Sequence, residues 1–220
     1  MGAFWAGEKS RKIVSRIVVE GDLTLKTPAC FGNGDTDEIV DMPLLVDPLD
    51  GRTPLLTGAS IAGALRNYLR EYELGYDSSE KKLVGREGNN NPASVRLFGT
   101  CRETEGEQSS LVVEDALGEN FGVEVRFGVA LDPGSRTAQE GKFFNFQLWS
   151  AGTTFPLRLE LAIREGDDEV FLKRALATAL EGLNKGSITL GARKRRGYGQ
   201  VFVEKWRVKN YNMSYAVNGK

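Results

Sequence analysis

The stretch Leu157-Arg-Leu-Glu-Leu-Ala-Ile-Arg164 alternates apolar residues with charged or small ones, and this period of two predicts a strand with one buried face. Over residues 169–184 the apolar residues take the spacing of a helix with one apolar side. Asp167 or Asp168 can cap the start of this helix. A strand followed at once by a helix is typical of folds that mix the two elements.

Residues 123–149, just upstream, predict a long β-hairpin. Large apolar residues alternate with polar ones on both sides of Asp132-Pro-Gly134, which is a turn signal. The tip of the predicted hairpin is polar and includes Arg136 and Lys142.

The remaining elements are strands at residues 17–25, 111–114 and 201–208 and a helix that begins after Ser60, its expected N-cap, and stops at Gly75. The glycine- and asparagine-rich residues 76–94 are interpreted as a loop. Strands and helices that interleave in this order predict an α+β fold. We expect a ferredoxin-like split β-α-β sheet with helices on one face, decorated by the hairpin and by loop insertions.

Composition limits the chemistry that the chain can perform. It has 220 residues and no histidine, which excludes histidine acid–base catalysis, serine–histidine and cysteine–histidine nucleophile pairs, and zinc sites with histidine ligands. Its two cysteines, Cys30 and Cys101, cannot make a four-cysteine zinc site, and we expect free thiols. Since no apolar run approaches the roughly 20 residues of a membrane helix, we expect a cytoplasmic protein.

The segment Gly191–Gly199 is the sharpest local signal. It holds four consecutive cations and an aromatic residue between glycines: Arg193, Lys194, Arg195, Arg196 and Tyr198. The glycines can let the backbone approach a ligand, the cations can bind phosphate, and the tyrosine can stack on a base. The alternative is a solvated basic loop before an edge strand.

Two other segments also leave alternatives open. Residues 58–66 place Ser60 and Arg66 at a helix start, where they can form an anion site or serve only capping and packing. The loop at residues 32–50 carries six carboxylates: Asp35, Asp37, Glu38, Asp41, Asp47 and Asp50. One or two of them can hold Mg²⁺, and the alternative is a solvated acidic loop.

These segments belong to an ordered set of short motifs. The set comprises Phe31-Gly-Asn-Gly34, Val40-Asp-Met-Pro-Leu-Leu-Val-Asp-Pro48, Thr57–Arg66, Leu97-Phe-Gly99, Val112-Val-Glu-Asp115, Arg136-Thr-Ala138, Phe144-Asn-Phe-Gln-Leu148 and Gly191–Gly199. In this order the motifs resemble the RAMP superfamily of CRISPR-associated proteins. More narrowly, the chain looks like the repeated backbone subunit of type III effector complexes.

The resemblance implies a single domain over residues 1–220. It would consist of an RNA-recognition-type palm, at about residues 13–120 and 153–208, and a hairpin thumb at about residues 121–152. In such proteins several copies stack along a guide RNA, and each thumb interrupts the guide–target duplex at a regular interval. The thumb tip, the helix start and the glycine-rich segment are then expected to contact RNA.

Asp41 falls where catalytic members of this family carry the aspartate that cleaves target RNA. The resemblance therefore implies an endoribonuclease subunit that uses Mg²⁺ or another divalent cation, weakly held at Asp41. Its partners would be a CRISPR guide RNA, a complementary target RNA and other effector subunits, including copies of itself or close relatives. Two alternatives stay open: a catalytically inactive RNA-binding scaffold, and a guide-processing RNase, against which the absence of histidine counts.

Overall fold

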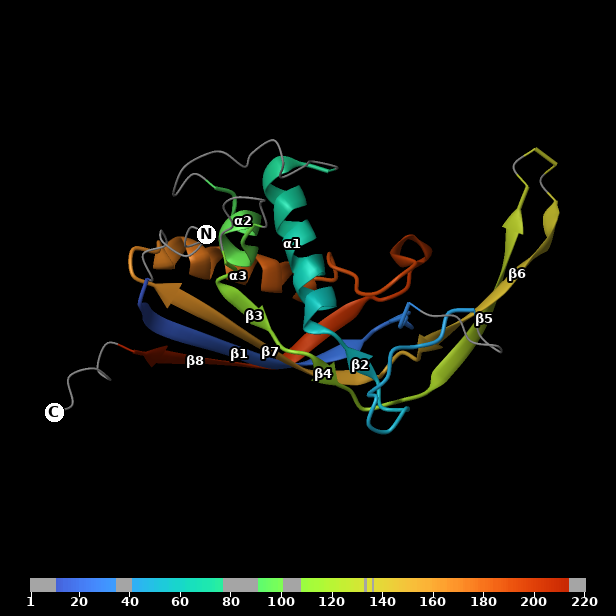
Figure 1. Ribbon diagram of the computed structural model, residues 1–220, viewed down its shortest axis with the longest axis horizontal. Helices are drawn as coiled ribbons and strands as arrows, with labels where there is room; N and C mark the ends of the chain where they lie inside the picture. The colour runs from blue at the N-terminus through green and yellow to red at the C-terminus, as the bar shows by residue number, and fades with distance from the viewer. Residues whose placement is uncertain are drawn as a thin grey trace, which may run out of the picture.

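The computed structural model describes residues 11–34, 41–76, 91–100, 108–132, 134–135 and 137–213, with backbone only at residues 130–131 and 138–142. Its main sheet contains β1 (Ile13–Leu25), β3 (Leu111–Val113), β7 (Thr154–Arg164) and β8 (Val201–Asn212). The helices of the described residues are α1 (Gly58–Leu74), α2 (Ala93–Phe98) and α3 (Glu169–Asn184). Figure 1 shows these helices on one side of the sheet and a hairpin that projects from one end of the molecule.

The main sheet is antiparallel throughout, in the order β3-β7-β1-β8. Central strand β1 pairs with β7 on one side and with β8 on the other, so that Val19 lies between Leu159 and Val208. Helix α1 follows β1 and helix α3 connects β7 to β8. This arrangement confirms the predicted α+β, ferredoxin-like architecture.

The core lies between the sheet and the helices. The inward-facing residues of β1 and β7 alternate as predicted, and Leu23 and Leu159 are completely buried. Ile61 and Leu65 of α1 and Leu183 of α3 cover them from the helical side. Burial of each such side chain contributes about 1.5–3 kcal/mol, which explains why the alternation predicted these strands.

The hairpin is inserted between β3 and β7 and consists of β5 (Val123–Leu131) and β6 (Ala138–Trp149). Near its base, Phe146 and Leu148 are buried against the rest of the chain. On its other face Phe127 stacks on Phe143 with ring centroids 5.5 Å apart, and both side chains are about two-thirds exposed (65% and 67%). The alternation therefore predicted the strands, although one apolar face of this hairpin has no covering layer among the described residues.

Three sequence-based expectations were wrong. Thr57, rather than Ser60, is the N-cap of α1, because its hydroxyl accepts a hydrogen bond from the Ser60 backbone N–H at 3.3 Å. Helix α2 begins at Ala93, inside the expected loop at residues 76–94, of which residues 77–90 lie outside the described residues. Strand β8 continues to Asn212 because it pairs with the full length of β1.

Two small strands, β2 (Leu55–Leu56) and β4 (Ala116–Leu117), pair beside the start of α1. There the backbone N–H of Gly58 donates a hydrogen bond to the Asp115 carboxylate at 2.7 Å. The helix start lies so close to β3 that a Cβ on Gly58 would come within 2.0 Å of the Val113 carbonyl oxygen. Glycine is thus required at this position by the contact between α1 and β3.

We predict that Gly58→Ala destabilises the fold by about 1–3 kcal/mol, because the added methyl group displaces α1 from β3. Gly63→Ala on the same helix is the matched control, since a Cβ there meets no described atom within 4 Å. The control should be about 0.5–1 kcal/mol more stable than the wild type, because alanine favours a helix interior. Urea unfolding of the three full-length proteins measures both changes, and equal stability of Gly58→Ala and wild type would contradict the packing argument.

Candidate functional site

Three segments that lie far apart in the sequence meet at the base of the hairpin. They are residues 41–46, strand β6 and the basic segment at residues 191–199. Side chains from these segments pack together with Cys30 in a small apolar cluster, which has a buried centre and a partly buried rim. The centre is Cys30, Phe146 and Leu148, and the rim is Met42, Phe144, Ala192 and Tyr198.

Asp41 is exposed and lies at the free edge of β6. Its backbone N–H donates to Asn145 Oδ1 at 3.0 Å, and the Asn145 backbone N–H donates to Asp41 Oδ2 at 2.8 Å. Met42 continues the contact as a parallel bridge to Phe146, and its carbonyl oxygen accepts from the Gln147 N–H at 3.2 Å. The predicted catalytic residue is therefore bonded to the hairpin.

Arg193 is held inside this junction and adopts a left-handed backbone conformation with φ of 58°. Its guanidinium lies 4.1 Å from the ring centroid of Phe146 and 4.8 Å from that of Phe144, and it donates to the Met42 sulfur at 3.3 Å. Its Nε is buried with no hydrogen-bond partner among the described residues. A desolvated cation over aromatic rings gains about 2 kcal/mol, which offsets part of that cost.

Cys30 lies beneath this arginine. Burial raises the pKa of its thiol, although the positive charge of Arg193 acts in the opposite direction. Cys30 is a free cysteine, as expected, and it packs as a small apolar group. Cys101 lies outside the described residues.

The other cations of the segment point away from the cluster. Lys194, Arg195 and Arg196 form a short 3-10 turn and are exposed. The Arg195 guanidinium donates to the Tyr76 hydroxyl at 3.0 Å, beyond the C-terminal end of α1. Partial desolvation lowers the pKa of Lys194, and the nearby Glu71 carboxylate opposes that shift. These three side chains are the part of the segment that can reach a phosphate.

The glycine and aromatic residues of the segment serve contacts within the chain. A Cβ on Gly199 would lie 1.9 Å from the Leu190 carbonyl oxygen, so the close approach is to the protein's own backbone rather than to a ligand. Its N–H is also engaged, since it donates to the Pro28 carbonyl at 2.9 Å. Tyr198 is half-buried and packs edge-on against Phe146 at 6.2 Å. Its contact with RNA stays a prediction.

The residues predicted at the helix start do not join the junction. Ser60 is exposed in the first turn of α1, and its hydroxyl shares a 2.8 Å hydrogen bond with Thr57. The Arg66 guanidinium donates to the Gly99 carbonyl at 3.1 Å and so satisfies the end of α2. From Ser60 to Leu74 the helix rises by about 20 Å, so Ser60 lies at the opposite end of α1 from the contact between Arg195 and Tyr76.

The hairpin-tip residues are less fully described. Arg136 lies outside the described residues, and Lys142 is described only by its place in β6. Their predicted contacts with RNA stay predictions.

Among the described carboxylates of the acidic loop, Asp47 and Asp50 are engaged in turns. Asp47 accepts from the Leu49 N–H in a tight turn, and Asp50 accepts from the backbone and hydroxyl of Thr53. These hydrogen bonds lower the pKa of Asp50 to about 2. Asp35, Asp37 and Glu38, which were also considered as ligands, lie outside the described residues.

At Asp41 the structure offers one exposed carboxylate. The described residues contain no group of three side chains that could hold a metal ion. Mg²⁺ keeps several waters and commonly uses one or two carboxylates together with substrate phosphates. The donor set therefore fits a weakly held Mg²⁺ that shares RNA oxygens. The described residues do not supply enough ligands to enclose a metal by protein groups alone.

Sequence reasoning missed Asn145 as a member of this site. An asparagine between two phenylalanines in a strand is unfavourable by propensity, and this was the available signal. Its partner Asp41 is 104 residues away, so the pairing depends on the fold.

Two other surfaces are poor candidates for RNA. On the outer face of the sheet Glu20 pairs with Arg158, Arg207 and Lys209, and a hydrogen bond from Lys209 is the main reason why the pKa of Glu20 is lowered. These cations are already engaged in ion pairs with Glu20 and, for Arg158, also with Glu114. RNA-recognition sheets instead offer aromatic rings for base stacking.

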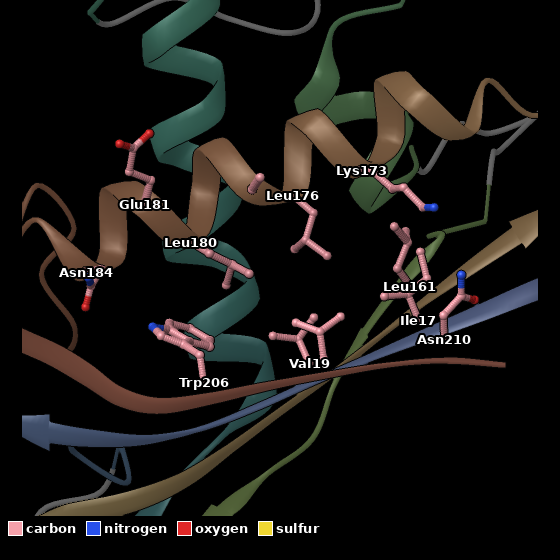
Figure 2. A pocket seen from close by; sticks show the side chains of 12 residues that line it. Ile17, Val19, Leu161, Lys173, Leu176, Leu180, Glu181, Asn184, Trp206 and Asn210 are labelled. Carbon is pink, nitrogen blue, oxygen red and sulfur yellow. The ribbon is translucent and has the colours of Figure 1, made fainter.

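The second surface is a cavity of about 600 Å³ beneath α3, at the end of the sheet away from the hairpin (Figures 1 and 2). Its walls are mainly apolar and include Leu176, Leu180 and Trp206. The lining also includes two charged residues, Lys173 and Glu181. Such a lining does not suit a phosphate backbone, whose binding requires several cations.

The family model described as the RAMP superfamily matches residues 22–202, which is most of the chain. A search of curated proteins found no match. None of the described helices is long and apolar enough to cross a membrane. The chain belongs to the RAMP superfamily and is a CRISPR-associated, RNA-binding protein.

Proposed function

We propose that this protein is a guide-RNA-binding backbone subunit of a type III CRISPR effector complex, and that it cleaves complementary target RNA at Asp41 with Mg²⁺. Its partners would be the guide, the target, other effector subunits and further copies of itself or close relatives. The palm would comprise residues 13–120 and 153–208 of one domain, and the thumb residues 121–152. The single observation that carries the proposal is the junction where Asp41, the base of the hairpin and the basic segment meet.

The junction supports RNA cleavage because it combines the parts that such a reaction needs. Lys194, Arg195 and Arg196 provide exposed positive charge for a phosphate backbone. The hairpin extends from the same place and can separate neighbouring nucleotides. Asp41 is held at its base by two hydrogen bonds, and a fixed carboxylate can place a reacting group more accurately than a solvated one can.

Mg²⁺ at this site would stabilise the negative charge that develops on the phosphate during cleavage. Asp41 would help to hold the ion or orient the attacking 2′-hydroxyl, while the exposed cations hold the strand. The chain has no histidine, so proton transfer by an imidazole of this subunit is excluded.

The alternative function is that of an inactive RNA-binding scaffold. The exposed carboxylate at Asp41 favours it, since the described residues contain no group of three potential metal ligands. The two functions differ in whether the assembled complex cleaves a complementary RNA.

We predict that Asp41→Ala lowers the single-turnover rate of target cleavage by about 100-fold or more, while guide and target binding stay within a few-fold of wild type. Asp41→Asn keeps an oxygen that can accept from the Asn145 N–H and removes only the charge. It should be as inactive as the alanine variant. The measurement uses labelled complementary RNA and the assembled complex, with and without EDTA, beside a binding assay.

The outcomes of this experiment separate the possibilities. Cleavage by Asp41→Ala at the wild-type rate would contradict the catalytic role of Asp41. Wild-type cleavage that persists in EDTA would remove the metal from the proposal. A wild-type complex that binds its target and never cleaves it would leave the scaffold function.

We predict that replacement of Lys194, Arg195 and Arg196 by alanine weakens RNA binding and reduces its dependence on salt. Each lost phosphate contact lowers the log–log salt slope by about 0.7 for single-stranded RNA, so three contacts lower it by about 2. Binding titrations from low to high salt measure the slope.

The matched control removes three cations from the outer face of the sheet, where Lys205, Arg207 and Lys209 pair with Asp22 and Glu20. It changes the net charge by the same amount and should leave the slope near that of the wild type. Equal slopes for the two triple variants would show that the basic segment has no special role in RNA binding.

A further inference from the structure

We propose that Asn145, on strand β6 of the hairpin, is a positioning residue that fixes the Asp41 carboxylate against the base of the hairpin. This inference rests on the proposed function and concerns the control of the same site. It assigns a role to a residue that touches neither substrate nor metal in the proposed reaction.

The contact between the two residues is reciprocal. Each residue donates its backbone N–H to the side-chain oxygen of the other, at 3.0 Å for Asp41 and 2.8 Å for Asn145. One of these bonds fixes a carboxylate oxygen and the other fixes the backbone from which the carboxylate extends. Two bonds with opposite directions restrict rotation of Asp41 much more than either bond alone.

The segment that follows Asp41 is also bonded to β6. Gln147 donates its N–H to the Met42 carbonyl at 3.2 Å and accepts from the Leu44 N–H through its side chain at 3.3 Å. Residues 41–44 thus lie along the outer edge of β6. Contacts with the palm begin at Pro43, whose carbonyl accepts from the Asn33 N–H at 3.3 Å, and continue at Leu45, whose N–H donates to the Phe31 carbonyl at 2.6 Å. Residues 43–45 therefore join the hairpin edge to the palm, and Asp41 and Met42 precede these palm contacts.

Arg193, in the basic segment, contacts both β6 and the residue that follows Asp41, and so strengthens the attachment of Asp41 to β6. Its guanidinium contacts the Met42 sulfur and the rings of Phe144 and Phe146, the neighbours of Asn145 in β6. The strand and the residue after Asp41 are thus held by the same cation. Because Arg193 belongs to the palm, it holds the hairpin base and the Asp41 segment together at the junction, which keeps the Asp41 carboxylate in register with the nucleotide that the hairpin separates.

The test compares three variants in the assembled complex. Asn145→Ala removes the acceptor for the Asp41 N–H and should slow cleavage of bound target by about 10- to 100-fold, with target affinity unchanged. Asn145→Ser keeps an uncharged acceptor oxygen and should recover part of this loss, because a serine hydroxyl can accept a similar hydrogen bond. Gln147→Ala removes a bond of the same kind from the same segment, three residues beyond Asp41, and should slow cleavage by less than about threefold.

A second readout does not depend on activity. Since Asp41 is exposed, its amide should be protected from hydrogen exchange mainly by the bond to Asn145. Exchange measured by mass spectrometry should be faster at this amide in Asn145→Ala and intermediate in Asn145→Ser. Peptides from α1 should exchange at the same rate in all variants.

The inference is overturned if Asn145→Ala leaves either the exchange of the Asp41 amide or the cleavage of bound target unchanged. It is also overturned if Gln147→Ala slows cleavage as much as Asn145→Ala does. If Asp41→Ala loses cleavage and Asn145→Ala cleaves at the wild-type rate, the proposed function stays intact and only the positioning role is removed. A wild-type complex that does not cleave would overturn the proposed reaction and, with it, this role.

Discussion

The contact of the Arg193 guanidinium with Met42 and the two phenylalanine rings is the interaction on which the site depends. It places one cation against three groups from two other segments, at 3.3–4.8 Å, over the buried centre of Cys30, Phe146 and Leu148. A charge in such surroundings is stable only when the groups around it stay in place. The basic segment, the Asp41 loop and the hairpin base are therefore fixed together, although a long stretch of sequence separates them.

This constraint divides the cations of the basic segment into two kinds. Arg193 maintains the structure of the junction, and its neighbours Lys194, Arg195 and Arg196 face solvent, where they can meet phosphate. The same division explains Gly199, whose missing side chain lets the segment lie against Leu190. Some residues of the basic segment, such as Arg193 and Gly199, therefore hold the segment in place, and the other cations present positive charge to solvent.

The sequence predicted those parts of the fold that repeat with a regular period. Strand β7, helix α3 and the hairpin were predicted because each buries residues at a constant spacing over many positions. Helix α2 was missed because it is only six residues long and follows an asparagine-rich stretch. The N-cap of α1 was misplaced because Thr57 and Ser60 are both suitable hydroxyls, three residues apart. Asp41 could be found from a motif, but its bond to Asn145 could not, since it exists only when the chain folds.

The central claim is that RNA passes the base of the hairpin, with the bond to be cleaved beside Asp41. A structure of the assembled complex, with guide and a target that carries a 2′-deoxy sugar at the cleavage position, tests this most directly. The account predicts that the uncleaved phosphate lies next to the Asp41 carboxylate at the edge of β6, with Lys194, Arg195 or Arg196 on the adjoining backbone. A target that instead crosses the ion-paired outer face of the sheet, or the cavity beneath α3, would contradict this account.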